Sequence, residues 1–406
     1  MASAFSKLWT HGPAAIVVEV IIGAMVADGL LLGFILLRRA YRKRYFAKRD
    51  GRVYELRKKW EALISGEIPY DTWRRSAFDR RIVEEIALDA IEAASSEEFT
   101  RLLAFLRATG LIEKRIFEAR KHHGWRRLRA LVALGRTRAP EGIPALAEAL
   151  RDPDEETRHA ALRGLGRVGL PEAGEEILTW LGENGLRVSP LPLQNALIHC
   201  CRTRPRMLLP YLQYADRPMR EVLARVFGEI ATDALQAEAL ALACDELPEL
   251  RAAAARALSH ADRQGPALHA LSELAQDGVW FVRLRAVVAL GEIDGAAATS
   301  PLLGALRDPN RLVRMRAAEG LATRTADMAA IFAEVVATQD RYALHAYLTA
   351  IENTGLRERL EEELLERRAR GAAGAEHLLA VLRSERVTAE PGAPGPAHEP
   401  VTASRS

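Results

Sequence analysis

The sequence predicts an all-α protein in which one transmembrane helix precedes a right-handed α-solenoid of helical hairpins. Three observations predict this fold. Residues 14–37 form a nearly unbroken apolar run, and a turn containing aspartate returns about every 32 residues from Asp152 onward. Between these turns, aliphatic residues recur at spacings of three and four, which is the period of a helix with one buried face.

The apolar run at residues 14–37 is long enough to be a transmembrane helix. At about 1.5 Å per residue it measures roughly 36 Å, more than the ~30 Å of a hydrocarbon core. It is followed at once by "RRAYRKRYFAKR" rather than by the cleavage site of a signal peptide, so we expect an uncleaved anchor. Basic residues lie almost entirely after the run, which places residues 1–13 outside and the rest in the cytoplasm. The prediction is a single-pass protein of a bacterial inner membrane.

A dense basic segment follows the predicted span. Residues 38–61 contain eleven lysines or arginines and three acids, a net charge of +8, whereas residues 62–406 sum to −4. Lysine or arginine near anionic headgroups gains about 1 kcal/mol each. We therefore expect residues 38–66 to form a basic juxtamembrane helix and residues 38–59 to bind the anionic membrane surface. This distribution of charge argues against nucleic acid as a ligand.

The predicted span contains two carboxylates, Glu19 and Asp28. Asp28 lies deep in the hydrocarbon, where an acidic side chain costs about 2.5–3.5 kcal/mol. One interpretation is that Asp28 is protonated and tolerated. The other is that it hydrogen-bonds to a partner's membrane helix, with Gly29 and Gly33 forming an adjacent small-residue surface for close helix contact. Under this second hypothesis Asp28, Gly29 and Gly33 are part of a docking surface.

Residues 67–123 are predicted to form a helical N-terminal cap for the solenoid. A first helix is expected to begin at Asp71, and a second has Ser95 and Glu98 at the spacing of a capping box, with Gly110 as its stop. The first unit of a solenoid has no preceding neighbour, so an atypical helical pair is expected there to cover its apolar edge.

From residue 124 the sequence repeats with a constant pattern. Successive turn positions, six aspartates and one asparagine, are 32, 32, 29, 32, 31 and 32 residues apart, and an arginine lies in the first turn of each second helix except in the unit at Asn184. Such an arginine can reach carboxylates or carbonyls of its own or the preceding unit. We therefore predict a structural ladder rather than a catalytic site. Its members are Asp152, Arg158, Asp245, Arg251, Asp277, Arg283, Asp308 and Arg314.

The repeated "VRLRAVVALGEI" and its counterparts resemble HEAT repeats, in particular the HEAT-like repeats of phycobilisome lyases. The resemblance covers about residues 124–352 and departs at residue 184, where the turn lacks its aspartate and Pro190 and Pro192 follow. We expect the solenoid and its C-terminal helices to occupy residues 124–385 and residues 386–406 to be a disordered tail. The resemblance implies a scaffold that presents surfaces to other macromolecules.

The second helices of HEAT solenoids line the inner curve. Offsets of two, five and nine residues from each ladder arginine are expected on the exposed face, and at least one arginine occupies them in every repeat. Arginine suits carboxylate or phosphate, so the hypothesis is a docking face for an acidic protein segment; solvated positions in an arginine-rich protein are the alternative. The predicted binding residues are Arg129, Arg136, Arg163, Arg167, Arg225, Arg256, Arg285 and Arg316.

The partner expected from this resemblance is another membrane protein, such as a glycosyltransferase. No catalytic motif, small-molecule substrate, cofactor or metal is predicted. "GLGRVG" from residue 164 ends a helix instead of following a strand, and "HCC" from His199 lacks a second ligand pair at zinc-site spacing. Two alternatives remain: a phycobilin-lyase-like enzyme or chaperone of a cofactor protein, and a nucleic-acid-binding HEAT-like protein.

Overall fold

The computed structural model describes residues 13–69, 71–74, 76–259, 265–293, 296–326 and 328–385, and within them all regular structure is helical. The chain forms two compact units, Met1–Ala145 and Leu146–Ser406. Residues 1–12, expected outside the membrane, and residues 386–406, expected to be a disordered tail, lie outside the described residues.

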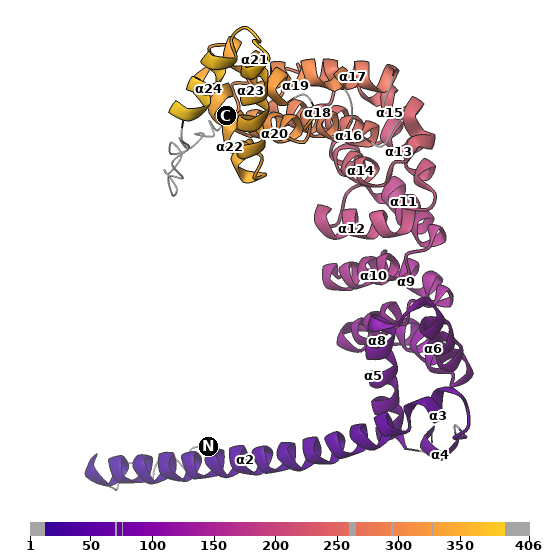
Figure 1. Ribbon diagram of the computed structural model, residues 1–406. Coiled ribbons are helices and arrows are strands. Elements are labelled where there is room, and N and C mark those ends of the chain that lie inside the picture. Colours follow the sequence, from indigo (N-terminus) through magenta and orange to yellow (C-terminus); the bar gives the residue numbers. More distant parts are fainter. Residues whose placement is uncertain are drawn as a thin grey trace. The chain divides into compact units, whose positions relative to one another are not determined.

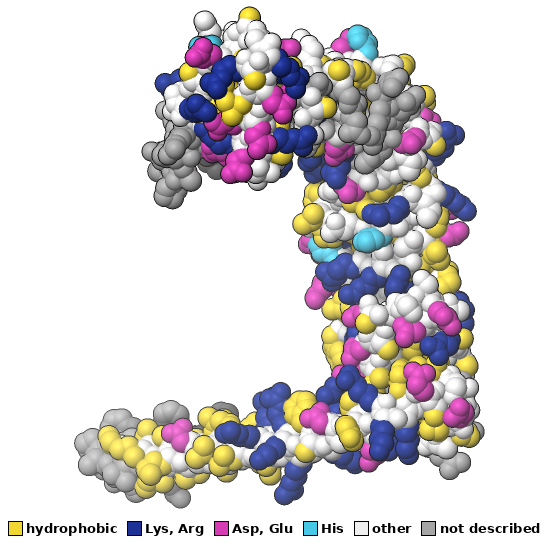
Figure 2. Space-filling view, in the orientation of Figure 1, with side chains coloured by type: hydrophobic (Ala, Val, Ile, Leu, Met, Phe, Trp, Pro, Cys, Tyr) yellow, Lys and Arg dark blue, Asp and Glu magenta, His cyan; other side chains and the backbone are white. Residues whose placement is uncertain are grey.

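The first unit begins with one long helix, α2 (Pro13–Lys58), which is about 69 Å long at the usual rise. It continues without a break through the junction at residues 37 and 38, so the basic segment extends the apolar segment in the same helix (Figure 1). The helix from Val20 contains an apolar stretch of 18 residues, long enough to cross a membrane, and none of this stretch is buried by the protein. Figure 2 shows hydrophobic side chains along this part and basic ones after it. A signal sequence would share these properties of length and composition.

The other helices of the first unit follow α2 in the chain, and α5 packs against it. They are α3 (Trp60–Ile64), α4 (Asp71–Arg74), α5 (Ala77–Ala93), α6 (Ser96–Ala108), α7 (Leu111–Lys121), α8 (Gly124–Thr137) and η1 (Pro140–Gly142).

Two of the expected helix boundaries are found and one is wrong. Ser95 and Glu98 form the capping box of α6, and Gly110 takes a left-handed conformation (φ 67°) between α6 and α7. The single helix expected from Asp71 is instead divided into α4 and α5. Ser76 has an extended backbone, and its side chain accepts a hydrogen bond from the Asp79 N–H, so it caps a new helix.

The second unit consists of helical hairpins in two layers. Even-numbered helices lie along one side and odd-numbered ones along the other (Figure 1). The even layer is α10 (Glu155–Val168), α12 (Pro190–Cys201), α14 (Arg217–Ile230), α16 (Pro248–Leu258), α18 (Trp280–Glu292), α20 (Arg311–Ala322) and α22 (Arg341–Asn353). The odd layer is α11 (Pro171–Asn184), α13 (Leu209–Tyr214), α15 (Gln236–Leu242), α17 (Pro266–Leu274), α19 (Thr299–Ala305) and α21 (Met328–Ala337).

Shorter elements complete the second unit. The 3-10 turns η2 (Pro205–Leu208), η3 (Asp233–Leu235) and η4 (Ala296–Ala298) precede α13, α15 and α19, and α23 (Arg357–Ala369) and α24 (Ala375–Ser384) end it. Helix α9 (Ile143–Ala149) contains the boundary between the two units.

Neighbouring helices of the even layer pack in sequence order, and small residues set their spacing. A Cβ added to Gly166 on α10 would lie 2.8 Å from Cα of Ala196 on α12, and one added to Gly320 on α20 would lie 2.9 Å from Cα of Gly291 on α18. These backbones therefore approach too closely for a side chain at either glycine. The core between the layers is mainly alanine and leucine, as the periodicity predicts.

Candidate partner-binding face

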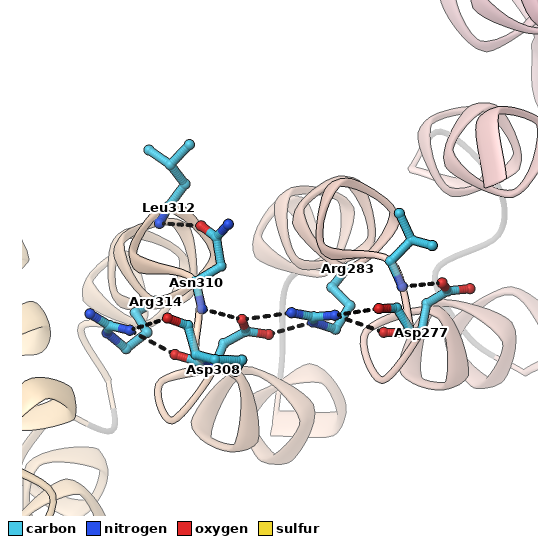
Figure 3. Close-up of polar contacts among 9 residues, drawn as sticks. Asp277, Arg283, Asp308, Asn310, Leu312 and Arg314 are labelled. Carbon is cyan, nitrogen blue, oxygen red and sulfur yellow. Dashed lines mark hydrogen bonds and ion pairs between the residues drawn. The ribbon is translucent and has the colours of Figure 1, made fainter. Parts of the chain in front are cut away.

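An arginine in each of several even-numbered helices joins its own repeat to the next. Arg283 on α18 donates from Nε and Nη2 to the carboxylate oxygens of Asp308, at 2.6 and 3.0 Å. Its Nη1 donates to the carbonyl of Asp277 at 2.9 Å, in the turn before α18. One guanidinium thus fastens the turn of its own repeat to that of the following repeat (Figure 3).

The contact with the following carboxylate recurs in the two preceding repeats. Arg251 binds the carboxylate of Asp277 through Nε and Nη2 at 2.7 and 3.0 Å, and Arg220 reaches Asp245 at 2.6 Å. The carboxylate partner is always in the following repeat, so the expected contact with the preceding one is wrong. Each aspartate also accepts the backbone N–H two residues later, which holds its carboxylate toward the incoming arginine.

The ladder loses its carboxylate rungs at both ends of this run. Arg158 donates to the carbonyls of Asp152 and Pro153, and Arg314 to those of Asp308 and Pro309. The position that would serve Arg158 is Asn184, whose side-chain amide instead donates to the carbonyl of Trp180. The missing aspartate at residue 184 therefore has a direct structural consequence.

The guanidinium groups change the ionisation of the ladder carboxylates. Burial alone would raise the pKa of Asp277, but hydrogen bonds from Arg251 and the Val279 N–H, with the charges of Arg251 and Arg283, outweigh it. The pKa of Asp277 lies below its ordinary value. The hydrogen bond from Arg283 to Asp308 likewise raises the pKa of Arg283. Both groups are therefore charged at neutral pH.

Beside the ladder, the exposed side of α10, α12, α14, α16, α18, α20 and α22 forms a surface that we call the even-helix face. Most described positions at offsets of five and nine residues are exposed on it, although Arg256 and Val288 are half-buried and His260 lies outside the described residues. In three repeats the residue at the offset of two is not on this face, because Ala160, Val222 and Ala253 are buried. The neighbouring offset of one, as at His159 and Glu221, lies nearer the surface. At the offset of two, only Arg285 and Arg316 are exposed in this unit, since a long stem carries the charge outward.

Four of the eight predicted arginines differ from the rest because they have neither a hydrogen bond nor an ion pair in the part of the chain that the structure describes. All four are exposed, and they lie on three helices of the second unit. They are Arg163, Arg167, Arg225 and Arg285. We call them the open arginines.

Of the other four, three form ion pairs and the fourth, Arg129, lies in the first unit. Arg256 forms an ion pair with Glu229, and Arg316 pairs with Glu319 on its own helix. In the first unit, Arg136 binds both Asp89 and Glu92. Arg129 is exposed and lines a pocket of the first unit. The eight residues therefore do not form one equivalent stripe.

A groove between α20 and α22 lies at the C-terminal end of the even-helix face. Its volume is about 330 Å³, and Met315, Tyr342 and His345 line it together with Arg311 and Arg314. The guanidinium of Arg314 lies 5.4 Å from the centre of the Tyr342 ring. The sequence analysis missed this groove, although Met315 and Tyr342, large apolar residues at surface offsets, were a signal for it.

The anchor residues singled out in the sequence lie on the bare part of α2. Asp28 is exposed, and a Cβ added to Gly29 or Gly33 would meet nothing within 4 Å. No described part of the protein covers this side of the helix. Its role in contacting a partner's membrane helix stays a prediction.

The cysteines of the "HCC" segment are packing residues. Cys200 and Cys201 are fully buried, and burial raises the pKa of each thiol to about 12. The Sγ of Cys200 lies 3.4 Å from the carbonyl of Leu165, to which it can donate. No group of three or more His, Cys, Asp or Glu side chains suited to a metal ion occurs among the described residues.

Comparison with known proteins identifies the repeats. Residues 117–187, 248–322 and 267–352 match the family model for HEAT repeats. No curated protein matches the sequence significantly.

Similar solved structures include an engineered protein, at 16% identity and a TM-score of 0.38, with 80% of this chain and 98% of that chain covered. Another is human deoxyhypusine hydroxylase in complex with glycerol, at 21% identity and a TM-score of 0.26, with 61% of this chain and 95% of that chain covered. A third is the complex of CpcE and CpcF of phycocyanin lyase from Nostoc sp. PCC7120, at 17% identity and a TM-score of 0.24, with 59% of this chain and 87% of that chain covered. At these TM-scores and identities, the likenesses carry no argument about what this chain binds.

The turns recur at a constant period, and the hairpins stack in two layers in the order of the sequence. With the match to the family model, these features show that residues 117–187 and 248–352 consist of HEAT repeats.

Proposed function

We propose that this chain is a membrane-anchored, non-catalytic scaffold whose even-helix face binds an acidic segment of a protein partner. The observation that carries the proposal is the set of open arginines on α10, α14 and α18. Ladder arginines on α14, α16 and α18 hold carboxylates, whereas the open arginines beside them have no carboxylate partner among the described residues. An unpaired guanidinium can accept a carboxylate through two parallel hydrogen bonds.

The α20–α22 groove supplies a complementary apolar contact. Met315 and Tyr342 give it an apolar lining. Two arginines, Arg311 and Arg314, outnumber the one carboxylate, Glu319, so the groove has a net positive charge. An acidic segment with one large apolar side chain fits such a groove. Binding would then combine charge attraction along the face with an anchor at its end, as at many protein interfaces.

The long helix α2 supports placement of the scaffold at a membrane. Exposed apolar side chains cover it from Val20 to Leu37, which is unfavourable in water and favourable in lipid. The excess of basic residues after Leu37 supports an orientation with the repeats in the cytoplasm of a bacterium. A tethered scaffold meets membrane proteins most often, so a membrane enzyme such as a glycosyltransferase is the partner class we propose.

The residues just after the span suit passage through the headgroup layer. Arg38, Arg39, Arg42, Lys43 and Arg44 point to most sides of the helix at about 100° per residue, whereas a helix lying flat needs one apolar face. These residues are exposed and available to anionic headgroups.

Farther along α2 the basic side chains bind the protein itself. Arg49 pairs with Glu85, and Arg52 binds Asp79 at 2.9 and 3.1 Å. The lipid contact expected for residues 38–59 is therefore proposed only for the part before Arg49.

The test is charge reversal of the open arginines. A variant with Arg163, Arg225 and Arg285 changed to Glu should remain helical and membrane-bound but recover its crosslinked partner at less than about a tenth of the wild-type yield. The matched control changes the exposed Arg187, Arg202 and Arg307, which lie off this face, to Glu.

Equal recovery by the two variants would overturn the proposal. Recovery that vanishes after nuclease treatment would identify nucleic acid as the ligand instead. A coloured preparation would point to the lyase-like alternative.

A further inference from the structure

A second basic site lies in the first unit. Helices α5, α7 and α8 enclose a pocket of about 280 Å³. Its lining is mostly cationic and includes one exposed tryptophan. The charged and aromatic lining residues are Arg80, Arg81, Glu84, Lys114, Arg115, Glu118, His122, Trp125, Arg126 and Arg129.

Both carboxylates of the pocket are paired with one buried arginine. Arg115 donates from Nε and Nη2 to Glu84, with the second contact at 2.6 Å, and from Nη1 to Glu118 at 2.5 Å. The side chains of Arg115 and Glu84 are 10% and 6% exposed, so this pairing is part of the core. Of the other cations in the lining, Lys114 lies 3.9 Å from Glu118, and the four remaining arginines form no ion pair with either carboxylate.

The remaining arginines give the pocket a net positive charge. Six lysines or arginines against two carboxylates leave +4 with histidine neutral. Arg80, Arg81 and Arg129 have no hydrogen bond or ion pair in the described part of the chain, and the guanidinium of Arg126 lies 5.7 Å from the centre of the Trp125 ring. Fork-shaped donors converging on one hollow suit a phosphate group.

The contacts of α5 with α2 place this pocket near the end of the proposed span. Phe78, between the pocket residues Ala77 and Arg80, packs edge-on against Tyr45 with the ring centres 5.9 Å apart. Tyr45 is eight residues beyond Leu37, or about 12 Å along the helix axis. Because the headgroup layer takes up roughly 5–7 Å of that distance, the first turn of α5 lies within about one Debye length of the anionic surface.

Exposed aromatic rings accompany the charges. Trp125 is 67% exposed and Phe117 on α7 is 58% exposed, and the ammonium of Lys121 lies 5.0 Å from the centre of the Phe117 ring. Large aromatic rings beside basic groups are typical of a surface that enters the membrane interface.

We propose that the pocket formed by α5, α7 and α8 binds the phosphate of an anionic phospholipid headgroup, with Arg80, Arg81, Arg126 and Arg129 as its ligands and Trp125 at the interface. The proposal depends on the membrane span proposed above. It separates Arg129 from the partner-binding face and gives the first unit a role of its own, which is to fix the solenoid to the membrane surface.

The test is native mass spectrometry of the full chain in a neutral detergent, titrated with phosphatidylglycerol or phosphatidylcholine. Wild type should retain phosphatidylglycerol preferentially. Changing Arg80, Arg81, Arg126 and Arg129 to Gln should lower its affinity by at least about tenfold, since one surface arginine is worth about fivefold near anionic lipid. The same four residues changed to Lys should keep the preference, because the charge is retained.

The matched control changes four exposed arginines elsewhere, Arg187, Arg202, Arg307 and Arg359, to Gln and should leave the affinity unchanged. Equal phosphatidylglycerol retention by the pocket variant and this control would overturn the proposal. So would displacement of the lipid by millimolar inorganic phosphate, which would identify a soluble anion as the ligand.

Membrane fractionation of wild-type cells tests the span separately. A chain recovered in the soluble fraction would overturn the span and, with it, the lipid as this pocket's ligand. A chain in the membrane fraction whose pocket variant binds lipid normally would overturn the pocket alone.

Discussion

Replacing Arg283 by alanine tests whether the arginine ladder holds neighbouring repeats together. The substitution removes two hydrogen bonds to Asp308 and two to the carbonyls of the turn before α18. The Asp308 side chain is only 5% exposed and would keep just the Asn310 N–H, at 2.7 Å. A carboxylate would then be left buried without its countercharge.

The magnitude follows from this burial. Breaking a fully buried ion pair from one side costs about 3–5 kcal/mol. Arg283 is 13% exposed, and water can reach part of the site after truncation. We therefore expect a loss at the lower end, about 3 kcal/mol of unfolding free energy. Changing Asp308 to Ala as well should recover part of the loss, with a coupling energy of about 2 kcal/mol.

The assay is urea unfolding of the full chain in detergent, followed by far-ultraviolet circular dichroism. The control is Arg285→Ala, two residues away on the same helix, where an exposed arginine has no partner among the described residues. It should change the unfolding free energy by less than about 0.5 kcal/mol. If Arg283→Ala is as mild as Arg285→Ala, the ladder does not stabilise the stacking of repeats.

Three further predictions concern the packing, the pH dependence and the anchor. Gly320→Ala should destabilise by about 1–3 kcal/mol because its Cβ would meet the backbone of Gly291, whereas Gly304→Ala, in open space on α19, should stabilise by about 0.5–1 kcal/mol; equal melting shifts would contradict the close helix contact. Because the folded pKa of Asp277 is depressed, its stabilisation is present above the unfolded pKa of about 3.9 and is lost as the pH falls through the folded value. Asp277→Asn should therefore destabilise more at pH 7 than at a pH below the folded pKa of Asp277, and equal destabilisation in urea at both pH values would show that the ladder charge is unimportant. Asp28→Leu should leave the chain in the membrane but lower recovery of its partner, and unchanged recovery would make the span a passive tether.

The ladder was predictable because its two components repeat in phase. An aspartate in each turn and an arginine in each following first turn identify an interaction without coordinates. The direction of the contact was not predictable, because the same spacing allows the arginine to face either neighbour. Only the packed hairpins show that Arg251 and Arg283 reach forward.

The error on the exposed face has a geometric cause. Offsets of one, five and nine residues fall at about 100°, 140° and 180° around the helix, while an offset of two falls at about 200°. That last position lies at the edge of the buried stripe. Small residues such as Ala160 are covered there, whereas the long side chain of Arg285 reaches solvent.

Both pockets escaped the sequence analysis because their residues come from different helices. Tyr342 and Met315 are 27 residues apart, and Arg80 and Arg129 are 49 apart, so no local motif marks either set. The pairing of Arg115 with Glu84 and Glu118 was equally hidden. Without this pairing, Glu84 and Glu118 would have seemed available to the other arginines of the pocket.

The most direct test of the scaffold proposal is site-specific photocrosslinking in native membranes. A photoreactive residue at Asn195, exposed on α12 between α10 and α14, should crosslink to an acidic segment of a membrane protein, identified by mass spectrometry. The same group at Glu176, exposed on α11 in the odd layer, should not. Crosslinks from Glu176 but not from Asn195, or a partner peptide without acidic residues, would contradict the even-helix face as the docking surface.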